Sequence, residues 1–534
     1  MKSLTLCFAL LLASLLMLLL PGQDMYAQSA GRQTAAQAPV FPALDADPLA
    51  RDLALRARNG AYTWQDLADI ALWASGAPEY PPVSRNQKNP GPVRSYKEII
   101  VTAAAELRDS PDLPADLRNR GEYVLTFMYE KFMKAYSLNQ TRLDEIFTTG
   151  RYNCVSSAVL YTILATAVGL DVRGVMTRDH AFATVNTGTE SIDVETTNRY
   201  GFDPGSRREF HDNFGTATGF AYVPARNYRD RVSISPLELA SLIISNRIAE
   251  LETRNRYGEA VPLAVNRAAL LANRQDPVSS PFFADGEQDL LDRLFNYGSS
   301  LLKAGKETDA LAWVETAAAQ YPGKTPTGAP VGVRAPDIMD PRWPEFTYAA
   351  LNNYFIKLIR ASRFAEARDT LNRYASWLSA ANSHTLDTLI LDAELLRRVN
   401  ALGKTEDAET LLLAIDDVRR EALLPANRTE ELRNFVILKE GEQLAARQGP
   451  LAAIAYTEAA ITRYGQNTQL DQALRVHRQN RVAELHNSFA TLFNSRDYEA
   501  AREHVQNALE AFPGNRQLQS DLSTVEQTLR RQQP

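Results

Sequence analysis

The second half of the chain repeats one helical pattern, which limits the folds open to it more than any other feature. In residues 291–322 and 482–513, apolar and small residues fall at the same offsets, and each segment ends in proline. Weaker copies of the pattern are centred on Ala260, Ala367, Ala408 and Ala453. One helix pair is too small to bury its own apolar face, so units of this kind stack on their neighbours. We therefore predict an all-α solenoid of about five or six stacked helix pairs over residues 235–534.

The two clearest segments resemble tetratricopeptide repeats, which are helix pairs of about 34 residues. Matching positions of the two segments carry Leu294 and Leu485, Ala310 and Ala501, Val314 and Val505, and Ala317 and Ala508. The resemblance implies a superhelix whose concave surface binds a protein or peptide partner, including one linked to peptidoglycan. Nucleic acid is not expected as a partner, because a net charge of −6 leaves no dominant basic face.

The first residues have the pattern of a secretion signal. Lys2 precedes an apolar run over residues 4–20 that a Pro-Gly pair breaks, and Ala27 or Ser29 offers the small residue of a cleavage site. We therefore expect residues 1–27 to be removed and the protein to be exported to the periplasm or the extracellular space. A membrane tether would follow only if this segment stayed uncleaved.

Loss of the signal segment would leave a single cysteine in the mature chain. Cys7 would be removed and Cys154 would stay, so no internal disulfide is expected. A lone thiol in an oxidising compartment is exposed to unwanted oxidation unless it is buried and inert. The histidines and carboxylates of the chain form neither a metal-ligand cluster nor a cofactor motif, so we expect no metal and no cofactor. The role of Cys154 therefore depends on its neighbours.

Those neighbours predict a helix packed on a small antiparallel sheet. From Cys154 onward, apolar residues recur at intervals of three and four until Gly169 ends the helix. Three β-type runs follow, with a glycine-containing turn between the last two, at residues 171–176, 180–185 and 191–197. With a long helix predicted over residues 115–136, this makes an α+β domain over residues 115–231. A leader and a helical extension over residues 28–114 would precede it.

A thiol and an imidazole stand at neighbouring ends of these predicted elements. Cys154 begins its helix, where the partial positive charge of the helix end favours a thiolate. The free N–H groups of that helix end are placed to hold an oxyanion formed when the thiolate attacks a carbonyl. His180 opens the second β-run, close enough in sequence to fold back toward the cysteine. Such a pair is the nucleophile and base of cysteine-dependent acyl transfer.

The third member of such a site is an acid, and the acids expected near the histidine are, from nearest to farthest, Glu195, Asp193 and Asp203. Two hairpin registers are open. A turn at residues 187–188 places His180 opposite Glu195. A turn one residue later places Thr184 opposite Asp193 instead. In either register both acids share one face of the sheet with His180, and Glu195 lies nearer to it.

Residues 115–231 resemble the transglutaminase-like superfamily, a branch of the papain-like thiol enzymes. The motifs that carry the resemblance read YNCVSS, DHAFATV and DVETT. The resemblance implies that Cys154 is the nucleophile, that His180 is the general base and acid, and that Glu195 orients the imidazole. Many members of the superfamily carry Asp rather than Glu as the acid, so Asp193 is the alternative third member.

Two functions are compatible with these features. The first is an exported cysteine-dependent acyl-transfer enzyme of the peptidase, amidase or transglutaminase type, whose helical repeats bind a partner. The second is a non-catalytic protein-binding scaffold, in which the transglutaminase-like domain is degenerate and the solenoid carries the function. The first hypothesis requires the thiol, the imidazole and an acid to meet in space, which the structure can test.

Overall fold

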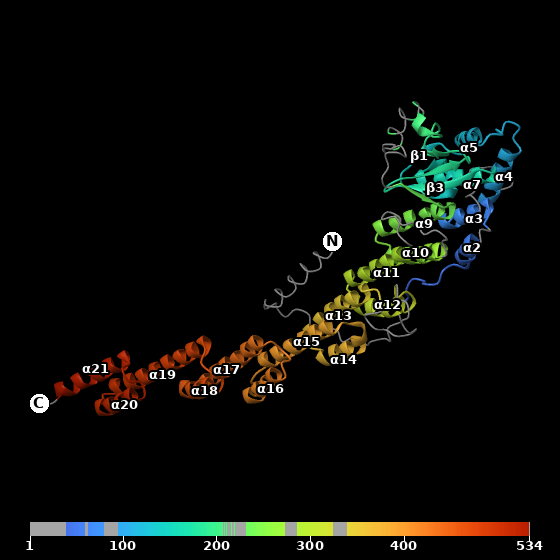
Figure 1. Cartoon of the computed structure of the whole chain (residues 1–534). Helices are drawn as coiled ribbons and strands as arrows, with labels where there is room; N and C mark the ends of the chain where they lie inside the picture. The colour runs from blue at the N-terminus through green and yellow to red at the C-terminus, as the bar shows by residue number, and fades with distance from the viewer. Residues whose placement is uncertain are drawn as a thin grey trace, which may run out of the picture. The chain divides into compact units, whose positions relative to one another are not determined.

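The computed structural model describes residues 39–58, 62–79, 94–206, 231–272, 286–323 and 339–532, and between 207 and 230 only Arg208, Phe210, Gly215 and Thr218. In this part the chain is mostly helical and carries one small antiparallel sheet (Figure 1). The predicted signal segment, residues 1–27, lies outside the described residues. Among the helices that the structure describes, none is both long and apolar enough to cross a membrane.

Several helices precede the sheet, among them α2 (Pro48–Arg58), α3 (Trp64–Ser75), α4 (Tyr96–Arg108) and α5 (Leu117–Lys131). Side chains fix two of their starts. Thr63 and Asp66 form a reciprocal capping box at α3. Ser95 and Glu98 do the same at α4. Each box satisfies backbone N–H groups that a helix start leaves without a partner.

The prediction of one long helix over residues 115–136 is wrong. Helix α5 ends at Lys131, and Phe132 and Met133 after it are buried. The chain then forms two short parallel strands on either side of a helix, namely β1 (Ala135–Tyr136), α6 (Leu143–Thr149) and β2 (Arg151–Tyr152). The helical spacing of apolar residues continues through Phe132, but the strand pairing with a later segment overrides that local preference.

Helix α7 (Cys154–Ala167) lies at the centre of this part of the molecule. Every residue of α7 except Thr166 is buried. Its neighbours on different sides are α3, α4, α5, α6, β3, β4 and α9. A helix that is apolar all round needs such an enclosure, because no side of it can face water at low cost. Cys154, its first residue, therefore has a rigid position.

The sheet has the strand order β5-β4-β3-β6 and consists of β3 (Asp171–Met176), β4 (Ala181–Asn186), β5 (Ser191–Val194) and β6 (Val232–Ile234). All of its neighbouring strands are antiparallel. Thr184 lies opposite Asp193, which confirms the second of the two predicted registers. A short 3-10 helix, η2 (Pro204–Ser206), follows the loop after β5.

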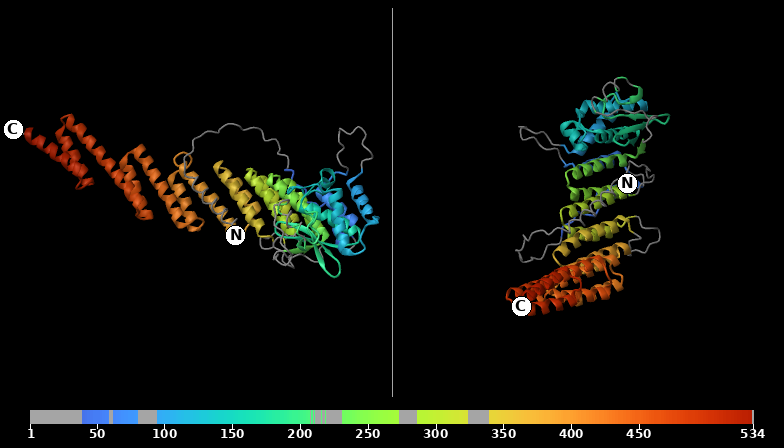
Figure 2. Two further views of the ribbon diagram at one scale, coloured as in Figure 1. Left: turned by 90° about the horizontal axis from the view of Figure 1, so that it is seen from above. Right: turned by 90° about the vertical axis from the view of Figure 1, so that its left-hand side faces the viewer.

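From residue 236 onward the described chain forms helices that follow one another as hairpins (Figure 2). Successive pairs are α9 (Pro236–Thr253) with α10 (Tyr257–Leu271), α11 (Gly286–Lys303) with α12 (Glu307–Gln320), α13 (Arg342–Arg360) with α14 (Phe364–Tyr374), α15 (Ala380–Asn400) with α16 (Ala408–Arg420), α17 (Ala426–Gln448) with α18 (Pro450–Tyr464), and α19 (Thr468–Asn494) with α20 (Tyr498–Ala511), before α21 (Arg516–Gln532). A short 3-10 helix, η5 (Ala375–Trp377), follows α14. Each helix packs on the next in sequence, and α11, α13, α15, α17, α19 and α21 also contact one another in turn.

The small residues of the repeated pattern lie where these helices touch. Ala310, Ala317, Ala501 and Ala508 are all buried. At Gly298 an added Cβ would stand 2.7 Å from the Phe346 ring and 3.2 Å from the Trp313 ring. The helices approach closely there because no side chain separates them.

Candidate active site

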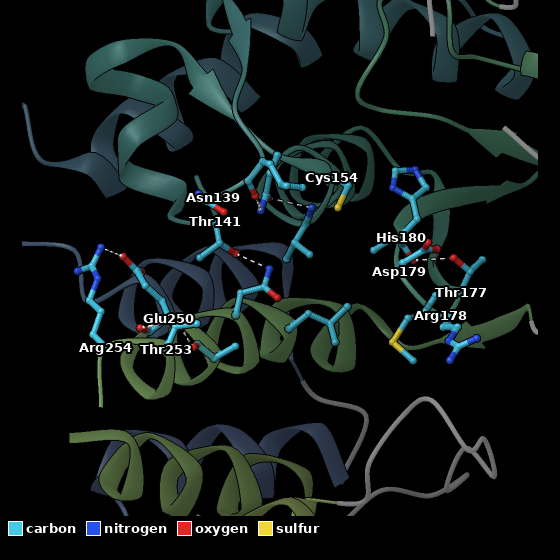
Figure 3. A pocket seen from close by; sticks show the side chains of 18 residues that line it. Asn139, Thr141, Cys154, Thr177, Arg178, Asp179, His180, Glu250, Thr253 and Arg254 are labelled. Carbon is cyan, nitrogen blue, oxygen red and sulfur yellow. Dashed lines mark hydrogen bonds and ion pairs between the residues drawn. The ribbon is translucent and has the colours of Figure 1, made fainter. Parts of the chain in front are cut away.

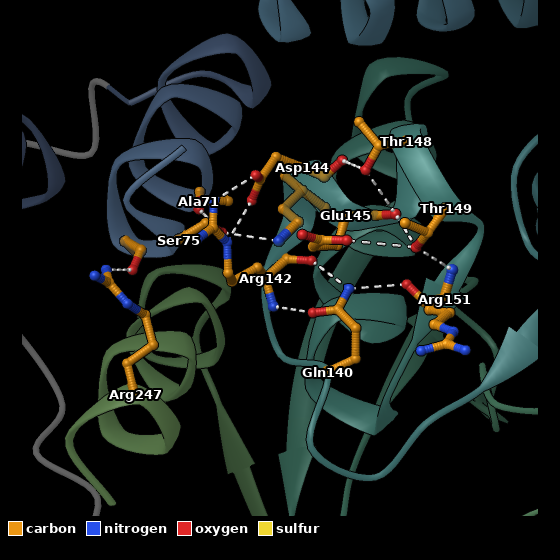
Figure 4. A network of polar contacts seen from close by, with 12 residues as sticks. Ala71, Ser75, Gln140, Arg142, Asp144, Glu145, Thr148, Thr149, Arg151 and Arg247 are labelled. Carbon is orange, nitrogen blue, oxygen red and sulfur yellow. Dashed lines mark hydrogen bonds and ion pairs between the residues drawn. The ribbon is translucent and has the colours of Figure 1, made fainter. Parts of the chain in front are cut away.

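A polar network fixes the segment that leads to the cysteine (Figure 4). The Gln140 side chain donates to the carbonyls of Arg142 and Arg151, at 2.8 Å in each case, and accepts from the Arg142 N–H. The Arg142 guanidinium pairs with the buried Asp144 carboxylate. Ser75 at the end of α3 accepts from the Leu143 N–H at 2.8 Å. These contacts tie the residues on either side of α6 to one another and to the end of α3.

Asn153 caps the helix that begins at the cysteine. Its side-chain oxygen accepts from the N–H groups of Val155 and Ser156, each at 3.0 Å, and Ser156 Oγ accepts from the Asn153 N–H. The sequence signal was present, because Asn with Ser three residues later is a capping box. The N–H groups of Val155 and Ser156 are therefore occupied, and the prediction that they hold an oxyanion is wrong. The N–H of Cys154 itself is the first-turn donor that Asn153 does not engage.

His180 is placed by a tight connection between two strands. Arg178 and Asp179 form the turn between β3 and β4, and the Thr177 N–H donates to the His180 carbonyl at 2.9 Å. The imidazole also lies 6.0 Å from the Phe182 ring, nearly parallel to it. The histidine thus stands at the head of a strand, one residue before β4 begins, as the sequence predicted.

Glu195 binds the far side of the imidazole. Its Oε2 lies 2.6 Å from His180 Nε2. Its Oε1 accepts from the Thr197 hydroxyl at 2.6 Å and from the Thr197 N–H at 3.3 Å. The carboxylate is fully buried and the imidazole is only 8% exposed. Each carboxylate oxygen therefore has a fixed partner, and the imidazole has little freedom to rotate.

The imidazole is influenced by the cysteine as well as by the acid. Burial alone lowers the pKa of His180, but the Glu195 charge, the Cys154 side chain and the hydrogen bond to Glu195 outweigh it and raise that pKa well above its usual value. The side chains of Cys154 and His180 border the same cavity (Figure 3). Since Nε2 faces Glu195, Nδ1 is the ring nitrogen left for the sulfur. The structure thus brings together three of the four predicted site residues.

The other two acids have different partners. Asp193 forms a two-pronged ion pair with Arg231, and one of these bonds is 2.6 Å long. That guanidinium also lies over the Phe182 ring, 4.9 Å from its centre. Asp203 pairs with Arg118. Glu195 is therefore the acid that is hydrogen-bonded to the imidazole in this structure, while the Asp193 carboxylate pairs with Arg231.

The loop after β5 places Glu195 by a close backbone approach. The Glu195 N–H donates to the Gly201 carbonyl at 2.7 Å. An added Cβ at Gly201 would stand 1.9 Å from the Glu195 carbonyl oxygen, which no real side chain tolerates. The Ser157 and Thr196 hydroxyls join this loop to α7 at 2.8 Å. The loop that carries Glu195 is therefore fixed to the helix that carries Cys154.

Cys154 and His180 line a cavity of about 650 Å³. Its opposite wall is α9, which lies below them in Figure 3 and contributes Leu242, Asn246, Ala249, Glu250, Thr253 and Arg254. Asn246 donates to Thr141 at 3.0 Å across this wall. The cavity has room for a segment of a substrate beside the sulfur. Sequence reasoning missed this wall, because α9 follows the cysteine by some eighty positions and carries no motif of its own.

Tyr136 is a second residue near the site that sequence reasoning missed. Its ring packs edge-on against Tyr152, with the centroids 6.1 Å apart. Its hydroxyl oxygen is shielded from solvent and has no hydrogen-bond partner among the described residues. Burial and the negative charges of Cys154 and Glu195 raise the pKa of this phenol. No sequence signal marked it, because the segment read as the end of a helix.

In the part of the chain that the structure describes, no group of His, Cys, Asp and Glu side chains could hold a metal ion.

Comparisons with known proteins add little to this picture. No family model matches the chain, and no curated protein matches it. One similar solved structure is menin, from the crystal structure that reveals its binding site for the Mixed Lineage Leukemia (MLL) protein. That match covers 82% of this chain and 99% of the menin chain, with 12% sequence identity and a TM-score of 0.27. A TM-score this low carries no argument about fold or function.

Proposed function

We propose that this chain is a cysteine-dependent acyl-transfer enzyme. The observation that carries the proposal is that the His180 ring is bonded to the buried Glu195 carboxylate and lines the same cavity as the Cys154 side chain. A nucleophile, a base and a group that orients the base are the three parts that such an enzyme needs. The start of α7, the residue before β4 and the loop after β5 supply these three parts.

The chemistry follows from which atoms face one another. The Cys154 thiolate attacks a carbonyl carbon, and the oxygen of that carbonyl takes the negative charge. The Cys154 N–H is placed near this oxygen by the helix start. Protonated His180 then gives its Nδ1 proton to the leaving amine, and the C–N bond breaks to leave a thioester. Water or a second amine attacks the thioester, His180 takes a proton from it, and the thiolate is released.

The surroundings of the triad support the same reading. The order of a cysteine helix followed by an antiparallel sheet that carries the histidine and the acid is the order expected of a transglutaminase-like domain. We infer that residues 115–231 form that domain and that the tetratricopeptide-like helices over residues 235–534 bind a protein or peptide partner. Export, with removal of residues 1–27, would place this thiol in an oxidising compartment.

Alkylation of the thiol tests the proposal without knowledge of the substrate. The mature chain has one cysteine, so incorporation of iodoacetamide, followed by intact mass, reports Cys154 alone. We expect alkylation at about pH 6 to be faster than that of free cysteine, because His180 favours the thiolate. His180→Ala should remove that advantage. A thiol as slow as free cysteine in the folded wild-type protein would overturn the proposal and favour the non-catalytic scaffold.

A further inference from the structure

We call the succession of helices from α9 to α21 the helical array. Its hydrophobic core is interrupted along α19. One buried cluster ends at Leu470, near the start of this helix. The next cluster begins at Leu485, four turns later. Between them, over residues 471–484, His477 is the only buried residue, and Val476 is 45% exposed. Helix α19 is continuous, but the buried apolar clusters at its two ends do not join along its middle.

A cavity of about 1040 Å³ lies at this interruption. It is bounded by α18 on one side, by α20 and the turn after it on the other, and by the middle of α19. Its apolar lining includes Leu451, Ile454, Val482 and Phe512. Leu451 is 59% exposed. The cavity thus offers an open apolar strip.

Basic side chains outnumber acidic ones in the lining of this cavity. Three arginines of α19 line it, namely Arg475, Arg478 and Arg481, whereas Glu458 is the one acid in its lining. This excess stands out in a chain whose net charge is −6. An electropositive hollow of this kind attracts and orients an acidic ligand.

Two of the three arginines form ion pairs at the surface, and the third forms none within the described residues. Arg481 pairs with Glu484 at 3.0 Å, and both side chains are partly exposed. Arg478 pairs with Glu458 at 2.6 Å, and both side chains are about half exposed. Such surface pairs contribute little, so a carboxylate of a ligand can replace Glu458. Arg475 forms no ion pair with any residue that the structure describes, and only its Nε donates, to the Asp471 carbonyl at 3.3 Å. Arg475 therefore offers a positive charge beside the apolar strip with no carboxylate of the described residues paired to it.

We propose that the cavity between α18 and α20 is a docking site for an acidic peptide segment that carries apolar side chains. Its carboxylates would pair with the α19 arginines, Arg475 first, and an apolar side chain would lie against Leu451 and Phe512. A single-stranded nucleic acid fits less well, because the lining offers only two rings for stacking, Phe512 and His504, and the His504 ring is already bonded to the Leu485 carbonyl at 3.0 Å. This docking site rests on the proposed role of the helices over residues 235–534 in partner binding, but it does not depend on the chemistry of the thiol site.

Fluorescence anisotropy with the full mature chain tests the proposal. The probe is a short fluorescein-labelled peptide of alternating Glu and Leu. We expect saturable binding that weakens as salt rises, because exposed ion pairs are screened. Arg475→Glu should weaken binding by about fivefold or more, since it replaces an attraction with a repulsion. Leu451→Ser should weaken binding with no change in the salt dependence.

Matched controls make the outcome decisive. Arg530→Glu makes the same charge change at an exposed arginine of α21 outside the cavity, and it should leave the dissociation constant within about twofold. A Gln/Leu peptide should bind much more weakly than the Glu/Leu peptide. The proposal is overturned if no binding saturates, if the two arginine variants behave alike, or if oligothymidylate binds more tightly than the acidic peptide. Circular dichroism confirms that each variant is folded.

Discussion

Replacement of Glu195 by Gln tests which acid sets the state of the imidazole. The two side chains have the same shape, so the hydrogen bond to His180 Nε2 can persist while the charge is lost. A hydrogen bond to a charged partner contributes about 1.5–3 kcal/mol, and a neutral one about 0.5–1.5 kcal/mol. The imidazolium would therefore lose about 1–1.5 kcal/mol of stabilisation, which is about 5- to 13-fold in an equilibrium. Burial of both groups makes this a lower limit.

The pH dependence of alkylation measures this loss. The neighbouring charge raises the pKa of His180 in the folded protein. Protonation of His180 therefore stabilises the fold fully below the pKa of the unfolded chain, about 6.5, and this stabilisation is lost as pH rises through the pKa of the folded protein. Without the Glu195 charge the imidazolium is lost at lower pH. We expect the upper pH limit of the fast alkylation of Cys154 to fall by about 0.7–1.1 pH units in Glu195→Gln.

Asp193→Asn is the matched control. The Asp193 carboxylate pairs with Arg231, so alkylation should follow the wild-type profile. The variant should still unfold more easily, by about 1–3 kcal/mol, because the Arg231 guanidinium loses its charged partner in a largely buried place. A wild-type alkylation profile in Glu195→Gln, or the loss appearing in Asp193→Asn instead, would refute the assignment of Glu195 as the orienting acid.

Three further outcomes are expected. Gly201→Ala should cost about 1–3 kcal/mol of unfolding free energy and slow alkylation of Cys154, since its Cβ would displace the Glu195 backbone; an unchanged thermal midpoint would contradict this. Tyr136→Phe should raise the free energy of unfolding by about 1 kcal/mol in denaturant titration, because it removes a buried hydroxyl without a hydrogen-bond partner; a loss of stability would show a partner for that hydroxyl. Burial lowers the pKa of His477 against an opposing effect of Glu442, so the array should lose stability as pH falls below about 6.5, and His477→Gln should remove that dependence.

The sequence could predict the site where local rules decide its geometry. The helix period placed Cys154 at a helix start, and the period of two placed the acid and His180 on one sheet face. Choice between the hairpin registers needed the structure, because the Thr-Gly-Thr turn suits both. The segment before α6 was misread as helix, since its strand pairing depends on residues that come later in the chain. Rules that consider only neighbouring residues cannot predict contacts between segments that are distant in sequence.

Helix α9 shows why the site and the array are not separate pieces of this molecule. It begins the succession of helix pairs, yet it also packs on α3, α7 and β3. Its buried residues lie on nearly every side of the helix and include Leu239, Ala240, Ile243, Ile244 and Ile248. A chain ending before α9 would expose one flank of α7 and remove the wall of the cavity that faces Cys154. The rigid position of the thiol therefore depends on the first helix of the array, and its reactivity belongs to the whole folded unit.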